Sequence, residues 1–171
     1  MSRLVIPGPS TPSKMLKDNL LSFGTLRVEL RDEHGNIKHD ETYNNLVVNA
    51  GLAFIAQSLL KTTSDTPARM THMGVGDSNT AAAAAQTDLQ AATNKVRVAL
   101  TSQTNVTGTV ANDSVQYIAT FPAGTGTWTI TEAGIFNAGA AGTMLSRAVI
   151  GPIAKGALDS LTITWNVRAG T

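Results

Sequence analysis

Residues 161–167, Leu-Thr-Ile-Thr-Trp-Asn-Val, alternate between large apolar and smaller polar side chains. Successive side chains of a β-strand point to opposite faces of its sheet, so this alternation predicts a strand with one buried face. The same alternation occurs in residues 24–31, Gly-Thr-Leu-Arg-Val-Glu-Leu-Arg, where the charged residues share one face. A turn around Gly35 and a more polar segment at 37–43 follow, which predicts a β-hairpin.

Further short segments with strand character follow along the chain. They lie at residues 46–48, 70–75, 95–101, 115–121, 127–132 and 143–150. Many short strands without a regular strand-helix-strand order are typical of antiparallel folds. We therefore predict a mainly β fold, an antiparallel β-sandwich or jelly-roll-like barrel, with one short helix and an extended N-terminal arm.

One segment has the periodicity of a helix. Asn49 belongs to a residue type that often caps helix N-termini, and apolar residues follow it at spacings of three and four. These apolar residues are Leu52, Phe54, Ile55, Leu59 and Leu60. We predict a helix near residues 50–60, followed by a polar loop at 61–68. The five alanines at 81–85 are predicted to lie in a loop, because so short a run does not hold a helix alone.

The first 23 residues differ from the rest, because Pro7, Pro9 and Pro12 interrupt any sheet or helix pattern. Fixing a residue costs on the order of 1–2 kcal/mol, whereas burying a large apolar side chain returns roughly 1.5–3 kcal/mol. Docking therefore becomes favourable when a partner subunit adds hydrogen bonds and buried surface. We predict an arm at 1–23 and a β-rich globular domain at 24–171, with a free terminus as the alternative to the arm. The residues expected to contact a neighbouring subunit are Leu4, Val5, Ile6, Met15, Leu16, Leu20 and Leu21.

The composition argues against several classes of function. Thirteen Lys and Arg and twelve Asp and Glu leave a net charge of +1, whereas a general nucleic-acid binder needs an excess of cations. Aromatic residues make up only 5% of the chain, which leaves few surfaces for base stacking. The chain has no cysteine and therefore no disulfide or thiolate site. No apolar run approaches the roughly 18 residues of a membrane span, so we expect no membrane partner.

No group of residues resembles an active site. His34, His39 and His72 lack the spacing and the acidic neighbours of metal-binding motifs. Glu132 is an isolated carboxylate in a nearly uncharged stretch, which fits either a buried catalytic acid or a carboxylate that accepts hydrogen bonds from the amides of a loop. Because no second acid or base accompanies it, we favour the structural interpretation. We expect no enzymatic activity, no cofactor and no metal.

Two further features have both a functional and a structural interpretation. Residues 74–77, Gly-Val-Gly-Asp, superficially suggest a phosphate-binding loop, but the lysine and the third glycine of such loops are missing. We interpret them as a tight turn after a strand. Trp128 and Trp165 could stack on sugars if they were exposed, but their place in alternating segments favours the core.

Two regions of the chain resemble small structural proteins of tailed bacteriophages. The first is residues 45–52, Asn-Leu-Val-Val-Asn-Ala-Gly-Leu, followed by the predicted helix and by Met-Gly-Val-Gly-Asp at 73–77. The second begins with residues 130–137, Ile-Thr-Glu-Ala-Gly-Ile-Phe-Asn. It continues with Gly-Thr-Met-Leu-Ser-Arg at 142–147, Ile-Ala-Lys at 153–155 and Asp-Ser-Leu-Thr-Ile-Thr-Trp at 159–165. The resemblance implies a virion structural protein made in the host bacterial cytoplasm.

Two kinds of phage protein share this pattern. A capsid decoration or cement protein clamps subunits of the shell, whereas a tail-fibre, baseplate or neck adaptor attaches fibres to the particle. The chain has no long fibrous continuation after its last predicted strand, and its arm suits contacts with neighbours, so we predict a decoration protein. Its expected partners are the major capsid protein and further copies of itself, as a homotrimer. The alternative is an adaptor bound to tail or portal components, and a host-glycan-binding module is a third hypothesis.

Overall fold

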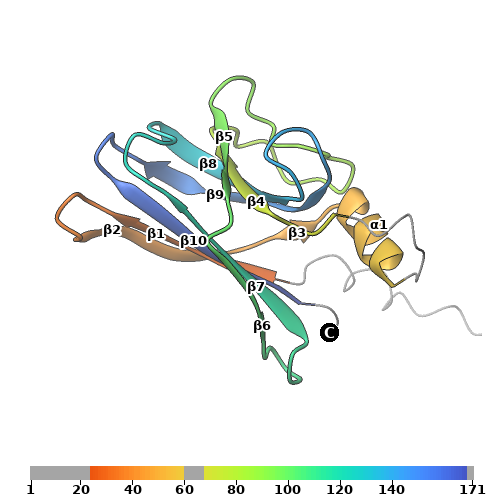
Figure 1. Ribbon diagram of the computed structural model, residues 1–171. Helices are drawn as coiled ribbons and strands as arrows, with labels where there is room; N and C mark the ends of the chain where they lie inside the picture. Colours follow the sequence, from red (N-terminus) through yellow and green to blue (C-terminus); the bar gives the residue numbers. More distant parts are fainter. Residues whose placement is uncertain (1–23, 60–67, 169–171) are drawn as a thin grey trace, which may run out of the picture.

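The computed structural model describes residues 24–59 and 68–168, which form two antiparallel sheets packed face to face and one helix (Figure 1). This confirms the predicted mainly β fold and its sandwich architecture. The elements are β1 Gly24–Arg31, β2 Ile37–Asn44, β3 Leu46–Val47, α1 Asn49–Ser58, β4 His72–Gly76, β5 Lys95–Ala99, β6 Ser102–Val106, β7 Ser114–Phe121, β8 Thr129–Phe136, β9 Met144–Ala154 and β10 Ser160–Arg168.

Each sheet has five strands. Sheet A has the order β2-β1-β10-β7-β6, and sheet B has the order β3-β9-β8-β4-β5. Every pair of neighbours is antiparallel. The predicted hairpin is β1–β2, and the pairing of β1 with β10 brings the two segments with the clearest alternation side by side.

The core lies between the two sheets and follows from that alternation. Leu161, Ile163 and Trp165 of β10 are fully buried, while the residues between them are half-buried on the other face. Removing such side chains from water stabilises the fold by roughly 1.5–3 kcal/mol each. Trp165 is therefore a core residue, as predicted. Trp128 precedes β8 rather than lying in a strand, and it packs half-buried against the same core.

The helix forms where it was predicted, but its start differs. Val48 occupies the N-cap position without a side-chain hydrogen bond, and Asn49 is already helical. The prediction that Asn49 caps the helix was wrong, because tertiary hydrogen bonds fix the entry instead. The Val48 amide donates to the carbonyl of Leu145 at 3.2 Å, and the Asn49 amide donates to the carbonyl of Ala84 at 2.8 Å. Of the predicted apolar face, Leu52, Phe54 and Ile55 pack on the core, whereas Leu59 is exposed and Leu60 lies outside the described residues.

Two strand assignments needed correction. Residues 74–76 are not a turn but the end of β4, which runs through Gly76 and pairs with both β5 and β8. Strand β6 was not predicted at all, because Ser-Gln-Thr-Asn-Val has no apolar alternation. It forms through backbone pairing with β7.

The predicted arm at 1–23, with its seven candidate contact residues, lies outside the described part of the chain, and the structure does not test the boundary at residue 24. Most of the predicted polar loop at 61–68 lies outside it as well. The part of the chain that the structure describes contains no helix with the length and apolar character needed to span a membrane.

Candidate functional site

The outward face of sheet B carries three glycines, two of which lie between two arginines. The strand registers place Arg97, Gly74, Gly134 and Arg147 in one row across β5, β4, β8 and β9. The next row on the same face, two residues along the strands, places Gly76 beside Glu132. We call Gly74, Gly76 and Gly134 the glycine floor.

The floor positions are glycine because other atoms come too close for a side chain. A Cβ at Gly76 would lie 2.5 Å from Oε1 of Glu132, and one at Gly74 would lie 3.0 Å from Cγ of Arg97. A Cβ at Gly134 would meet the ring of Phe136 at 3.0 Å. The motif Gly-Val-Gly therefore serves close packing rather than a turn.

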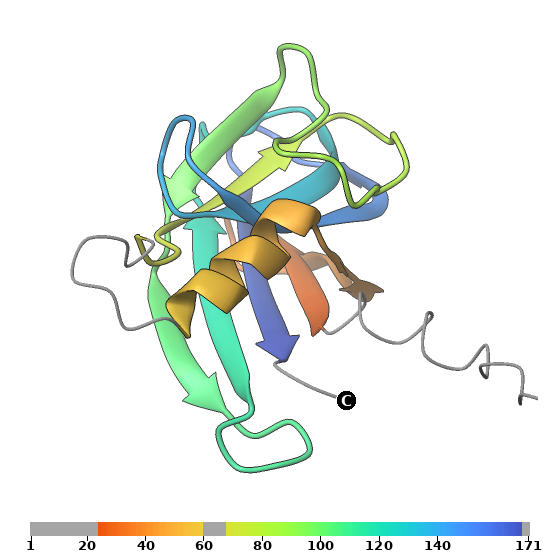
Figure 2. The same ribbon diagram turned by 90° about the vertical axis from the view of Figure 1, so that its right-hand side faces the viewer.

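A long loop between β4 and β5, residues 77–94, lies against this floor, and we call it the covering loop. Its Leu89 is buried in a small second apolar cluster on the outer face of sheet B, separate from the main core. The cluster consists of Val48, Leu89, Phe136 and Met144. The loop stands out at one side of the sandwich (Figure 2). As predicted, the alanine run within it lies in a loop, with a turn at Ala84 and Ala85.

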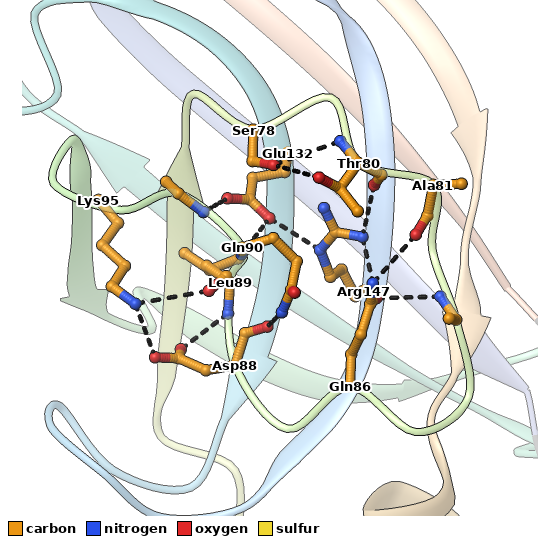
Figure 3. A network of polar contacts seen from close by, with 12 residues as sticks. Ser78, Thr80, Ala81, Gln86, Asp88, Leu89, Gln90, Lys95, Glu132 and Arg147 are labelled. Carbon is orange, nitrogen blue, oxygen red and sulfur yellow. Dashed lines mark hydrogen bonds and ion pairs between the residues drawn. The ribbon is translucent and has the colours of Figure 1, made fainter.

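Glu132 fixes one limb of the covering loop. Its carboxylate accepts hydrogen bonds from the backbone amides of Gln90 at 2.9 Å and Ala91 at 2.7 Å (Figure 3). Nε of Arg147 donates to the same carboxylate at 2.7 Å, and both charged side chains are fully buried. Glu132 therefore has the predicted structural role, in which its carboxylate accepts hydrogen bonds from the amides of a loop. The sequence did not indicate Arg147 as its partner.

Arg147 fixes the other limb. Its Nη1 donates to the carbonyl of Thr80 at 2.9 Å and to the side-chain oxygen of Gln86 at 3.0 Å. Gln86 in turn donates to the carbonyl of Ala81 and accepts from the amide of Ala83. One buried ion pair thus connects the sheet to both limbs of the loop (Figure 3).

Arg97 forms a second clamp at the other end of the glycine row. Its guanidinium lies over the ring of Phe136, 3.4 Å from the centroid, and Nη2 donates to Asp88 of the covering loop at 2.7 Å. Nη1 donates to the carbonyls of Ala138 and Ala141, so a second loop is held as well. Burial acts to raise the pKa of Asp88, but hydrogen bonds from Lys95 and Arg97 outweigh it and lower that pKa.

The covering loop presents an uncharged surface. Residues 78–87, Ser-Asn-Thr-Ala-Ala-Ala-Ala-Ala-Gln-Thr, contain no charge, and the side chains of Thr80, Ala81, Ala83 and Ala85 are exposed. Loops are usually mobile because few contacts hold them. Here the buried Arg147 and the half-buried Arg97 form hydrogen bonds with the covering loop. The arrangement is a neutral surface whose backbone is tethered to sheet B, and we call residues 78–87 the loop surface.

A similar clamp fixes turns at the edge of the sandwich. Nζ of Lys155 is buried and donates to the carbonyls of Pro122 and Asp159. Burial lowers the pKa of Lys155. Asp159 accepts from the amide of Gly156 and from Nζ of Lys38, and these contacts lower its pKa.

The three histidines that the sequence analysis considered as metal ligands lie apart from one another. His39 stacks on Tyr43 in β2, and Nδ1 of His72 lies 2.8 Å from Oγ1 of Thr71. His34 lies in the turn between β1 and β2. Within residues 24–59 and 68–168, no three His, Cys, Asp or Glu side chains gather as a metal site would require.

The family model of the N-terminal domain of phage tail-collar fibre proteins matches residues 39–165, well over half of the chain. The chain belongs to this family. It is a structural protein of a tailed-phage virion, as the resemblance in the sequence implied, and the match supports a tail-fibre role, the alternative, better than the predicted capsid decoration role. No curated protein and no solved structure matches it.

The motifs that carried the resemblance meet in this site. Gly76, Glu132, Gly134 and Arg147 come from segments far apart in the sequence and lie together on sheet B. Sequence reasoning missed Gln86 and Asp88 in the covering loop and gave Arg97 no role. The one available signal was the charge of Asp88, because Asp77 and Asp88 are the only charged residues in the covering loop.

Proposed function

We propose that this chain is an attachment domain of a phage tail fibre, an adaptor that binds another tail protein through the loop surface and performs no reaction. The family match supports this tail position better than the decoration hypothesis. The observation that carries the proposal is the buried Glu132–Arg147 pair, which holds the loop backbone in place before any partner arrives. A preorganised surface loses less conformational entropy on binding than a mobile one.

The absence of charge on the loop surface supports the same role. Low charge allows two proteins to meet without leaving buried, unpaired ions at their interface. Contact with a partner would also cover the exposed alanines. Assembly of several copies, with a homotrimer as the expected order, belongs to the proposal too, and light scattering of the purified chain measures it.

The experiment places one large charge on the loop surface. Particles lacking this chain are complemented with the wild-type chain, with Ala83→Arg or with Ala123→Arg, which alters an exposed alanine in the turn after β7. The amount of chain in purified particles is then measured by quantitative mass spectrometry. We expect Ala83→Arg to lower incorporation by on the order of tenfold, equivalent to about 1.4 kcal/mol of binding, and Ala123→Arg to retain it.

Equal incorporation of both variants, with equal thermal stability of the purified chains, would remove the loop surface from the proposal. Copy number in the wild-type particle tests the tail position itself. A number matching the tail fibres supports the adaptor, whereas a number matching the shell subunits favours the decoration hypothesis.

A further inference from the structure

Strand β6 is an open edge of sheet A. It is the last strand in the sheet order, so the outer side of its backbone has no strand partner among residues 24–59 and 68–168. Open edges pair readily with other extended segments, and proteins usually guard them with charges, prolines, bulges or very short strands.

The other edges of the described sheets have such protection. Edge strand β2 carries Lys38, Asp40 and Glu41, and its pairing with β1 contains a register shift. Strand β3 is only two residues long, and β5 carries Lys95 and Arg97. Strand β6, in contrast, is uncharged and pairs with β7 in continuous register. Its backbone is therefore the edge best suited to accept another strand.

A hollow with a partly apolar lining adjoins the inner face of β6. The partners of Gln103 and Asn105 in β7 belong to or pack on the main core, so these two residues share the core-facing side of the sheet. Beside them, between β6 and β7 and the end of α1, lies a hollow of about 350 Å³. Its apolar lining consists of Phe54, Met70, Val115 and Tyr117, and its polar lining consists of Ser58, Arg69, Gln103, Thr104 and Asn105.

We propose that residues 2–6, Ser-Arg-Leu-Val-Ile, add to β6 as a further strand of sheet A. These residues lie outside the described part of the chain. Side chains two positions apart share a face, so Leu4 and Ile6 would enter the hollow while Val5 lies opposite Thr104 on the other face. The donor matches the five residues of β6 in length. Pro7, which has no backbone N–H, ends the pairing.

The geometry of sheet A permits this docking. Gly24, Val167, Val115 and Asn105 lie in one row across β1, β10, β7 and β6. Three strand spacings of about 4.8 Å separate the ends of this row, roughly 14 Å in all. The 18 residues from Ile6 to Gly24 span up to roughly 60 Å when extended. The donor can therefore reach β6 of its own copy or of a neighbouring one.

Disulfide trapping tests the proposal, and the chain is suited to it because it contains no cysteine. In the Val5→Cys/Thr104→Cys variant the two thiols lie opposite each other whether the added strand runs parallel or antiparallel, provided that Leu4 and Ile6 face the hollow. The matched control is Val5→Cys/Thr42→Cys, which uses an exposed threonine on edge strand β2. We expect the Thr104 pair to form disulfide at least about tenfold faster than the Thr42 pair.

Non-reducing gels and mass spectrometry of linked peptides detect the disulfide and show which chains it joins. A dimer-sized product assigns the donor to a neighbouring copy, a monomer-sized product assigns it to the same copy, and either supports docking on β6. Adding Leu4→Ser and Ile6→Ser to the Thr104 pair should abolish its advantage. Equal rates for the Thr104 and Thr42 pairs, or an advantage that survives the serine substitutions, would overturn the proposal.

Discussion

At the scale of single residues, substitution of Glu132 or Arg147 is expected to change the free energy of unfolding most. Two buried charges 2.7 Å apart are stable only while each compensates the other. Glu132 also holds two loop amides, and Arg147 holds a loop carbonyl and a side-chain amide. Loss of one partner therefore leaves a buried charge and also releases part of the covering loop.

We predict that Arg147→Met lowers the free energy of unfolding by about 3–5 kcal/mol, because it leaves the Glu132 carboxylate buried without a counter-ion. Urea denaturation followed by tryptophan fluorescence measures the change. The double variant Glu132→Gln/Arg147→Met should recover part of this loss, since it removes the unpaired charge. A double variant as unstable as the sum of the two single variants would contradict the pairing.

Asp113 is a second residue with a testable electrostatic role. Its carboxylate accepts from the amides of Val110, Thr109 and Gly108, and these hydrogen bonds lower its pKa well below the ordinary value. A lowered folded-state pKa contributes stability above the unfolded pKa of about 3.9, and this contribution is lost as the pH falls through the folded pKa.

We therefore predict that Asp113→Asn is less stable than the wild type at pH 7 and that the difference shrinks as the pH falls below about 4. The measurement is the urea concentration at which half of each chain is unfolded, recorded at several pH values between about pH 2 and pH 7. This pH range covers the fall through the unfolded pKa. A difference that stays constant over this range would show that the charge of Asp113 is not what stabilises its loop.

At the scale of elements, the glycine floor determines how closely the covering loop approaches sheet B. Gly76→Ala would place a methyl group 2.5 Å from Oε1 of Glu132 and 3.0 Å from Cβ of Ala91. Overpacking of this kind typically costs about 1–3 kcal/mol.

We predict that Gly76→Ala lowers the unfolding free energy by this amount and increases hydrogen exchange at the amides of Gln90 and Ala91, because the new methyl displaces their acceptor. Gly139→Ala is the control, since the atoms nearest to its methyl belong to the half-buried ring of His72, the end of a side chain that can move aside. Hydrogen exchange followed by mass spectrometry distinguishes the two. Unchanged exchange in the covering loop of Gly76→Ala would contradict the role of the floor.

The elements also show which features a sequence can predict. Strands β1 and β10 were predictable because each buries one face, so apolar and polar residues alternate along its sequence. Strand β6 was not, because its polar residues pack little and its stability comes from backbone pairing with β7. The glycines of β4 were taken for a turn, since their reason for being glycine lies on β5 and β8 rather than nearby in the sequence. Glu132 showed its isolation in the sequence, but not the partner 15 residues later.

At the scale of the whole molecule, the sandwich is a rigid support with two distinct surfaces. The covering loop lies on the outer face of sheet B, while the open edge of β6 belongs to sheet A. In our proposals the first surface binds another tail protein and the second accepts an N-terminal strand. A domain that joins a fibre to a particle needs such separate surfaces, because attachment to the partner and assembly of copies must occur together.

The most direct test of this account locates the chain on intact particles. Antibodies against the purified chain, carried by gold particles and viewed by electron microscopy, label every accessible copy. We predict label confined to the tail, at the positions where fibres join it. Label distributed over the capsid shell would contradict the account.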